Sequence, residues 1–425
     1  MKTTLHIGQT LIFGDSPFEA SPEESAVHES RAGVLVVGGR IAATGSAEDL
    51  RRSNPHAQVL DHGRRLILPG FIDAHAHFPQ TAIIASWGKR LIDWLNTYTF
   101  PEEARFGDPA YAAAIAATYL DLCLANGITT AASYCTIHPE SVDALFEAAE
   151  TRGLRWVAGK VMMDRNAPVD LRDTAQSGYD FSKALLNKWH NRARMTYAIT
   201  PRFAPTSSHD QLEAAGALWS EFPNCPMQTH LCEQIEEIAW VRELYPDARD
   251  YFDVYQRAGL AGPGAVMGHA IHLGEREWQA IADTGTHIAH CPTSNTFIGS
   301  GLFDMARAQT ASIPTGLATD VGGGSSFSML RTMAAAYEIS QLRGAPLHPA
   351  QLIWLATQGS AQSLRLEDRI GSIAVGMEAD LITLDLASTP AIAQRQARAE
   401  TIWEAVFPTI MMGDDRAVQV VSIAG

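Results

Sequence analysis

The chain has 425 residues, 46% of them hydrophobic and 19% charged, and a formal net charge of −15. This composition can bury a large core, enough for one barrel-sized domain and a small second one. The acidic balance, with no basic cluster, argues against nucleic acid or an anionic membrane as a partner.

The sequence shows neither a predicted transmembrane span nor a predicted signal peptide. No apolar run approaches the length of a transmembrane span, and the first residues lack the apolar core of a signal peptide. The five cysteines are scattered without metal-finger spacing. Reduced thiols in a cytoplasmic protein are the simplest interpretation.

Residues 1–65 are predicted to form short strands joined by turns. Val34–Val37 leads into Gly38-Gly39, a hairpin-type turn, and Ile41–Gly45 then supplies a second strand. This pattern is typical of a small β unit.

From Leu66 onward, short apolar strands alternate with longer helical patterns. The predicted strands end near His77, Cys135, Met163, Phe203, Glu233, Leu273, Asn295 and Gly322. The predicted helices between them include residues 108–125, 141–152, 209–221 and 275–283. Eight strands with intervening helices indicate an α/β fold, a (β/α)8 TIM-type barrel over residues 66–370. The barrel would close after a strand at 313–320, with two more helices at 328–342 and 349–358.

Residues 371–425 return to β character. Residues 371–373 and 376–384 resemble hairpin strands, and 418–421 is another short strand. We expect this segment and residues 1–65 to form one small β-sandwich from both chain ends.

The stretch Leu68–His77 begins with a Pro-Gly turn signal and ends with two histidines one residue apart. Side chains alternate faces along a strand, so His75 and His77 point the same way and can aim at one metal ion. Taken alone, this pair fits equally well two polar residues on an exposed strand face.

Other candidate ligands follow at the ends of later strands, where barrels of this type carry their functional groups. The fifth, sixth and eighth strands contribute His230, Glu233, His269 and Asp320. Three neutral imidazoles and one carboxylate suit Zn²⁺, with a water completing the site, and Fe²⁺ would fit nearly as well. The predicted ligands of one zinc ion per subunit are His75, His77, His230 and Asp320.

The remaining acid and histidine receive catalytic roles. Glu233, just past its strand end, is expected to act on the metal-bound water as a general acid/base with a pKa raised by burial, although a surface helix-cap acid fits its position too. Asp320 could also accept a proton from the water. His269 is expected to hydrogen-bond the hydroxide or the substrate. The fourth strand has no lysine to bridge a second metal, while Lys160 on the third leaves that possibility open.

These residues resemble the signatures of the amidohydrolase superfamily over nearly the whole chain. The matching segments are Pro69–His77, Thr229–Glu233, Thr319-Asp320 and Gly376–Asp380. Within the superfamily the chain is similar to bacterial guanine deaminases. The longer segments that carry this likeness are Phe78–Gln80, Leu91–Pro101, Gly159–Pro168, Thr200–Thr206, His290–Asn295 and Thr319–Gly324.

The resemblance implies hydrolytic deamination of guanine to xanthine and ammonia in purine catabolism, by a homodimer. It places Gln80 and Arg202 against the purine, with Phe203 lining the pocket. Gln offers both donor and acceptor to a ring edge, and Arg donates to a carbonyl or ring nitrogen. Trp94 and Leu91 would form an apolar wall or lid. His77 and His230 would also lie beside the base.

The hypothesis for the reaction places C2 of guanine near the zinc-bound hydroxide. Glu233 protonates N3, hydroxide attacks C2, and Glu233 or Asp320 passes a proton to the departing ammonia. Two alternatives stay open: a related hydrolase acting on a triazine, pterin or adenosine derivative, and an inactive barrel that serves as a scaffold. A zinc assay on the purified protein distinguishes the scaffold.

Overall fold

The computed structural model describes residues 2–88 and 90–425. Contacts between Cα atoms divide the chain into two compact units. The first comprises the residues up to Ile72, Cys123–Thr129 and Ser328–Gly425, and the second comprises Asp73–Leu122 and Thr130–Phe327. The boundaries expected at residues 65 and 370 stay a prediction.

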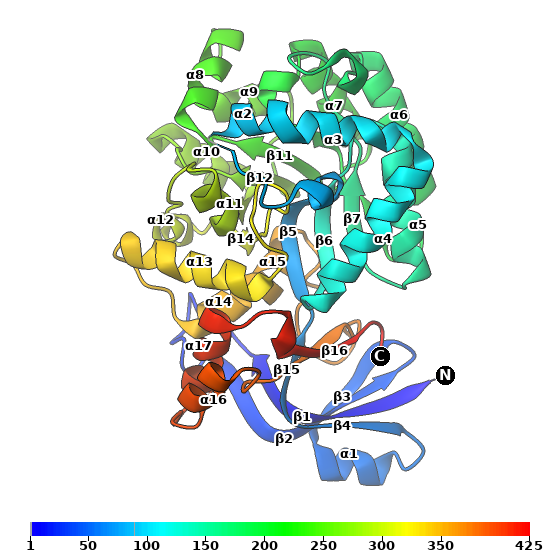
Figure 1. Ribbon diagram of the computed structural model, residues 1–425, viewed down its shortest axis with the longest axis vertical. Helices are drawn as coiled ribbons and strands as arrows, with labels where there is room; N and C mark the ends of the chain where they lie inside the picture. Colours follow the sequence, from blue (N-terminus) through cyan, green and yellow to red (C-terminus); the bar gives the residue numbers. More distant parts are fainter. Residues whose placement is uncertain (1, 89) are drawn as a thin grey trace. The chain divides into compact units, whose positions relative to one another are not determined.

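The first unit contains one six-stranded sheet with the order β16-β15-β4-β1-β2-β3 (Figure 1). Its strands are β1 (Thr3–Phe13), β2 (Ala26–Val37), β3 (Arg40–Ser46), β4 (Gln58–Pro69), β15 (Leu381–Leu384) and β16 (Val418–Ser422). β1 pairs with β2 antiparallel and with β4 parallel, and β15 pairs antiparallel with β4 and β16. Both chain ends therefore contribute to this sheet, but a sandwich of two sheets is not shown.

The second half of β2 is buried on both faces of the sheet. Val34 and Val36 pack in one apolar cluster with Ile41 and Ile67, whereas Leu35 packs in another with Leu5. Successive side chains of a strand point to opposite faces, so a continuous apolar run serves two cores. The helix α1 (Ala47–Ser53), capped by Ser46, contributes Ala47 to the second cluster.

The helices predicted at 328–342 and 349–358 are confirmed as α13 (Met329–Leu342) and as α14 (Pro349–Trp354) continued by a π-turn at Leu355–Gly359. A short helix, α15 (Ser360–Ser363), follows them. The β character expected for 371–425 was wrong in part, because Thr389 and Thr401 cap two helices there, α16 (Pro390–Gln396) and α17 (Ile402–Met412). The strand predicted at 371–373 was wrong, and that at 376–384 is confined to Leu381–Leu384. Gly371 and Gly376 adopt φ angles of 91° and 94°, which suit turns rather than strands.

The second unit contains short strands in three hydrogen-bonded groups, β5-β6-β7-β9, β8-β10 and β11-β12-β13-β14. These are β5 (Phe71–His77), β6 (Ile128–Tyr134), β7 (Trp156–Gly159), β8 (Val161–Met162), β9 (Met195–Tyr197), β10 (Thr200–Pro201), β11 (Met227–Leu231), β12 (Ala265–His269), β13 (His287–His290) and β14 (Thr315–Leu317). A parallel bridge joins Ile199 to Met227, and Asp320 N–H donates to the His75 carbonyl at 2.9 Å. This mixed α/β arrangement is consistent with the predicted TIM-type barrel.

Helices surround these strands (Figure 1). They are α4 (Pro109–Ala125), α5 (Pro139–Thr151), α6 (Ala175–Trp189), α7 (His209–Glu221), α8 (Ile235–Leu244), α9 (Tyr251–Arg257), α10 (Glu275–Thr284), α11 (Pro292–Phe297) and α12 (Met305–Thr310). The helices predicted at 108–125, 141–152, 209–221 and 275–283 are thus confirmed to within two residues. Over residues 2–88 and 90–425, no helix is long and apolar enough to cross a membrane.

Three strands end earlier than predicted. β12 stops at His269 rather than near Leu273, since His269 and Ala270 have φ angles of 67° and 50°, outside the β region. β13 stops at His290 rather than near Asn295, because Pro292 begins α11. β14 is shorter than the predicted 313–320 strand, and Asp320 itself has a φ of 49°.

Candidate active site

Four histidines and an aspartate from different strands meet in the second unit. His75 and His77 lie on β5, His230 on β11, His269 at the end of β12, and Asp320 three residues after β14. All five side chains are buried. Nε2 of His75 and of His77 lie 3.4 and 3.5 Å from Oδ1 of Asp320. The candidate ligands named from strand ends therefore lie close together in the structure.

The nitrogens of this cluster have the chemistry of metal ligands. Burial lowers the pKa of His75, His77 and His230, so these imidazoles are neutral. Nδ1 of His230 lies 2.7 Å from the Arg202 carbonyl oxygen, which can only accept, so that nitrogen carries the proton. Its Nε2 lone pair then faces Nε2 of His77 at 3.1 Å. Ring nitrogens of two different histidines that lie this close can both bind one cation.

Two overlapping groups have ligand atoms within 4.8 Å of one another. One is His75, His77 and Asp320, and the other is His75, His230 and His269. Nε2 of His75 is a buried atom without a hydrogen-bond partner among the described residues. The donor set fits Zn²⁺ with three or four ligands. His269, expected only near the hydroxide or substrate, lies within reach of the same centre.

Hydrogen bonds join β5 to the segment that carries Asp320. The buried Asp73 accepts a hydrogen bond from the Thr319 backbone at 2.9 Å and another from the Thr319 hydroxyl. Burial raises the pKa of Asp73 to about 7. Space for the His75 ring comes from Gly268 on β12, where a Cβ atom would lie 2.8 Å from Cε1 of His75. This glycine permits the close approach that the cluster requires.

The surroundings of the two carboxyl groups raise the pKa of Glu233 and lower the pKa of Asp320. Burial raises the pKa of Glu233 to about 7. Burial also acts to raise the pKa of Asp320, but the neighbouring imidazoles, His75 above all, outweigh it and lower that pKa to about 2. One carboxylate is therefore ionised at neutral pH, whereas the other can exchange a proton there. Such pairs are suited to divided acid and base roles.

Both the carboxylate and the backbone of Glu233 make hydrogen bonds or close polar contacts. The Ser300 hydroxyl donates to Oε1 at 3.0 Å, and Nε2 of His269 lies 3.5 Å from Oε2. The backbone N–H groups of Glu233 and Gln234 donate to Glu237 at 2.9 and 3.1 Å. Glu233 is thus a buried site residue and not a surface helix-cap acid, the alternative that its sequence position left open.

A cleft with about 380 Å³ of empty space opens beside this cluster. It is lined by His77, Gln80, Leu91, Trp94, Leu95, Arg202, Phe203, His230, Glu233, His269, Ile298, Asp320 and Gly323. All the residues expected to bind substrate or act in catalysis line this cleft, and the ligand candidate His75 lies in the metal cluster. Apolar walls with a few polar side chains are typical of a small-molecule site.

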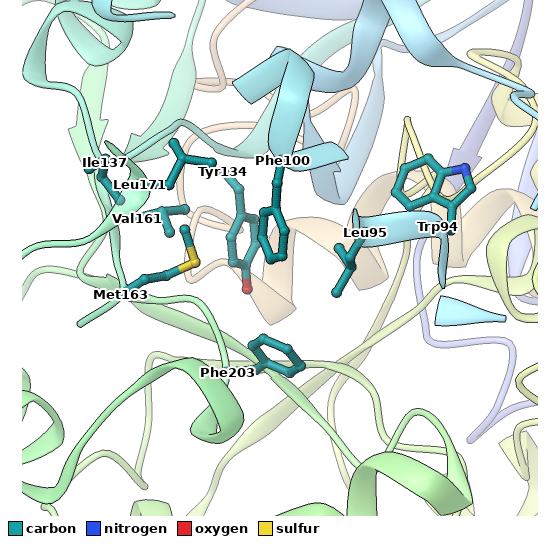
Figure 2. Packing of buried hydrophobic residues seen from close by; sticks show 9 residues of the cluster. All are labelled: Trp94, Leu95, Phe100, Tyr134, Ile137, Val161, Met163, Leu171 and Phe203. Atoms are coloured by element: carbon teal, nitrogen blue, oxygen red, sulfur yellow. The ribbon is translucent and has the colours of Figure 1, made fainter. Parts of the chain in front are cut away.

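The apolar wall of the cleft belongs to a larger buried cluster (Figure 2). Trp94, Leu95 and Phe100 come from the helical segment after β5, and Phe203 follows β10. That segment comprises α2 (Leu91–Trp94), a π-turn at Leu95–Thr99 and α3 (Phe100–Glu103). The Tyr134 ring packs against His75 and His77, each with ring centroids 4.6 Å apart. Trp94 and Leu95 of this segment therefore belong both to the apolar cluster and to the lining of the cleft.

Glu103 was missed by sequence reasoning. Its Oε1 accepts from Nε2 of Gln80 at 2.9 Å, and its Oε2 accepts from Nη1 of Arg202 at 2.6 Å. In the sequence it is the second of two glutamates after Pro101, with no spacing signal that marks a site. Ser300, in a loop after α11, was missed for the same reason.

The Lys160 ammonium has polar partners outside the metal cluster. Its ammonium pairs with Asp173 at 2.5 Å and donates to the Val161 carbonyl at 3.1 Å. These partners stabilise the buried charge of Lys160. The lysine is therefore explained without a second metal that it would bridge.

A model of the amidohydrolase family matches residues 66–425, and an imidazolonepropionase-like composite domain of bacteria matches residues 32–57. The chain belongs to the amidohydrolase family. The resemblance to this superfamily of hydrolases and to the guanine deaminases is therefore confirmed. The fold is the amidohydrolase fold, with mixed α/β content.

Guanine deaminases are among its most similar relatives. That of Escherichia coli (strain K12) is 44% identical over 402 residues, covering 94% of this chain and 92% of that protein. The solved E. coli structure has a TM-score of 0.97 at 40% identity, covering 99% of this chain and 98% of that one. The Bradyrhizobium japonicum structure has a TM-score of 0.97 at 32% identity, covering 100% and 98%. A C. acetobutylicum structure with guanine bound in the active site has a TM-score of 0.91 at 26% identity, covering 100% and 99%.

Proposed function

We propose that this protein catalyses the hydrolytic deamination of guanine to xanthine and ammonia. The observation that carries the proposal is the convergence of Gln80, Arg202 and Glu233 on one cleft beside the histidine cluster. The guanine deaminases to which the chain is similar support the choice of substrate.

Four residues would hold the metal, His75, His77, His230 and Asp320. One Zn²⁺ per subunit is the proposed ion, and Fe²⁺ would suit the same donors. When bound, it would lower the pKa of a coordinated water and supply a nucleophile near neutral pH.

The side chains of the cleft bind and orient the ring. Arg202 supplies donors to oxygen or nitrogen atoms of the purine, and Gln80 supplies a complementary amide group. Phe203, Trp94 and Leu91 provide apolar surface for the ring faces and exclude water. His77 and His230 border the base on the metal side.

Protons are moved by Glu233 and Asp320. Glu233, with a pKa of about 7, protonates N3 of guanine and makes C2 more electrophilic. Asp320 is ionised and accepts a proton from the attacking water. As the C2 carbonyl forms, the hydroxyl proton passes to Glu233, and Glu233 or Asp320 protonates the amino group, which leaves as ammonia. An N–H of His269 donates to the oxygen that adds to C2.

Several wider expectations accompany this proposal. The strands of the second unit would close as a (β/α)8 barrel, and the two chain ends would form the small β domain of a family member. We also propose a cytoplasmic homodimer that serves purine catabolism and binds neither nucleic acid nor membranes.

Ammonia release from guanine, adenine, cytosine, adenosine and melamine tests the activity. Zinc-replete protein is compared with a chelated control. Metal-dependent turnover of guanine alone is the expected result. Bound zinc without guanine turnover would redirect the substrate to another ring, such as a triazine, and absence of zinc binding would favour a scaffold.

A further inference from the structure

Glu103 is a buried carboxylate that contacts both polar side chains of the substrate cleft. It ends α3 and is 0% exposed. Its two oxygens have different partners, because Oε1 accepts from Gln80 and Oε2 accepts from Arg202. One side chain therefore links the turn after β5 with the loop after β10.

The chemistry of a carboxylate fixes how Gln80 must point. An ionised carboxylate only accepts hydrogen bonds, so the amide of Gln80 turns its NH₂ group toward Glu103. The oxygen Oε1 is then the hydrogen-bond acceptor of an amide that lines the cleft. Arg202 gives one amino group to Glu103, and its other N–H groups are donors only.

The backbone on the other side of Gln80 restrains the same amide. Gly322 has a φ of 109°, and a Cβ atom at this position would lie 2.1 Å from Oε1 of Gln80. The amide is thus packed between Glu103 and a glycine backbone. Its orientation is set by these two neighbours and not by the substrate alone.

We propose that Glu103 is a positioning residue that fixes the hydrogen-bond polarity of the cleft, with an acceptor at Gln80 and a donor at Arg202. The matching ligand edge carries a ring N–H beside a carbonyl oxygen, which is the lactam edge of a 6-oxopurine. A ring nitrogen with a lone pair at the N–H position would face the Gln80 oxygen and be rejected. The inference rests on the proposed function for its purine substrate.

Equilibrium binding of two non-reacting purines tests this polarity without catalysis. Hypoxanthine has the lactam edge and no 2-amino group, whereas unsubstituted purine has a bare ring nitrogen and no carbonyl. Zinc-replete wild type is expected to prefer hypoxanthine. In Glu103→Gln the new amide can donate to Gln80 and turn its oxygen away from the cleft. The hypoxanthine-to-purine affinity ratio should then fall by about tenfold or more, the scale of an unpaired buried polar group.

Glu102→Gln is the matched control. Glu102 pairs with Arg105 and Tyr111 and does not line the cleft, so its ratio should equal that of wild type. A folded Glu103→Gln variant with an unchanged ratio would overturn the proposal, because a merely structural ion pair alters both affinities alike.

Gln80→Met covers the case in which Glu103→Gln does not fold. This variant keeps the Glu103–Arg202 pair and removes the amide, so it should lose the hypoxanthine preference by a similar factor. An unchanged ratio in Gln80→Met would also overturn the proposal. Guanine turnover by the wild type is measured separately. A wild type without turnover, yet with the predicted ratios, would refute the proposed reaction and support the polarity of the cleft.

Discussion

Nε2 of His269 lies 3.5 Å from the carboxylate of Glu233. Nδ1 of the same ring lies 2.8 Å from the Asn295 side-chain oxygen, which accepts its N–H hydrogen bond. Burial acts to lower the pKa of His269, but the charges of Glu233 and Asp320 outweigh it and raise that pKa. The ring is therefore a donor placed between the two carboxylates, and the site can hold and move protons within a few ångströms.

Replacement of Glu233 by Gln should retain the metal and lose most turnover. The amide keeps the shape of the side chain but cannot exchange protons, and general acid/base groups contribute about 10²–10⁴-fold to rates. Metal analysis and steady-state ammonia release on the same sample check this outcome. The exposed Glu236→Gln on α8 is the control. Metal-loaded Glu233→Gln with near-normal turnover would refute the role.

Removal of the metal should lower both activity and thermal stability. The neutral histidine nitrogens that face one another lose their shared partner, and a ligand at 100 times its Kd stabilises the folded state by about 2.7 kcal/mol. Chelation should lower Tm and zinc should restore it. Asp320→Asn should weaken the zinc-dependent shift, whereas the exposed His28→Gln should keep it. Equal Tm values with and without zinc would argue against a metal site.

Substitution of Gly322 by Ala should damage substrate binding with little effect on metal content. The added Cβ would meet Oε1 of Gln80 at 2.1 Å, and a φ of 109° disfavours any side chain. Displacement of the amide by about 1 Å should lower kcat/KM by about 100-fold. Gly14→Ala, with no atom within 4 Å of its Cβ, is the control. Wild-type kcat/KM in Gly322→Ala would contradict this geometry.

Loss of Asp173 should destabilise the protein without loss of the metal ligands. The ammonium of Lys160 is 0% exposed, and Asp173→Asn leaves its charge unpaired. Breaking a buried pair in this way costs about 3–5 kcal/mol, to be measured by urea unfolding. The exposed Glu221→Gln, which loses its pair with Lys183, should change stability little. A small effect of Asp173→Asn would mean that Lys160 is neutral.

The histidine pair of the first unit should make folding sensitive to mild acid. Nδ1 of His6 lies 3.1 Å from Nε2 of His62, and burial followed by the charge of His62 lowers the pKa of His6 from 6.5 to about 4. Below pH 6.5 the unfolded chain takes up a proton that the folded chain binds only near pH 4. Stability should therefore fall over this window, by up to about 3 kcal/mol.

Unfolding free energies at pH 7 and pH 4.5 measure this effect. His6→Gln should show a smaller decrease than wild type, since the buried titrating group is gone. The exposed His56→Gln should follow the wild type. The same decrease in His6→Gln as in wild type would exclude the pair as its cause.

Local sequence patterns were sufficient for many of the elements and for choosing the candidate metal ligands. Alternation on a strand orients His75 and His77 together, and helix periodicity located segments such as Glu275–Thr284. His230, His269 and Asp320 could be named because parallel strands place their carboxyl ends at one edge. These features depend on residues close together in the chain, or on a single rule of topology.

Tertiary structure alone decided the contacts between distant residues. Glu103 contacts both Gln80 and Arg202, and Arg202 lies 99 residues after Glu103 in the chain. Asp173 forms the ion pair of Lys160. The single sheet of the first unit likewise depends on β4 pairing with β15, far along the chain. A buried polar group is placed by whichever partner the folded chain brings within hydrogen-bond distance. Because no local pattern records that partner, only the packed structure identifies it.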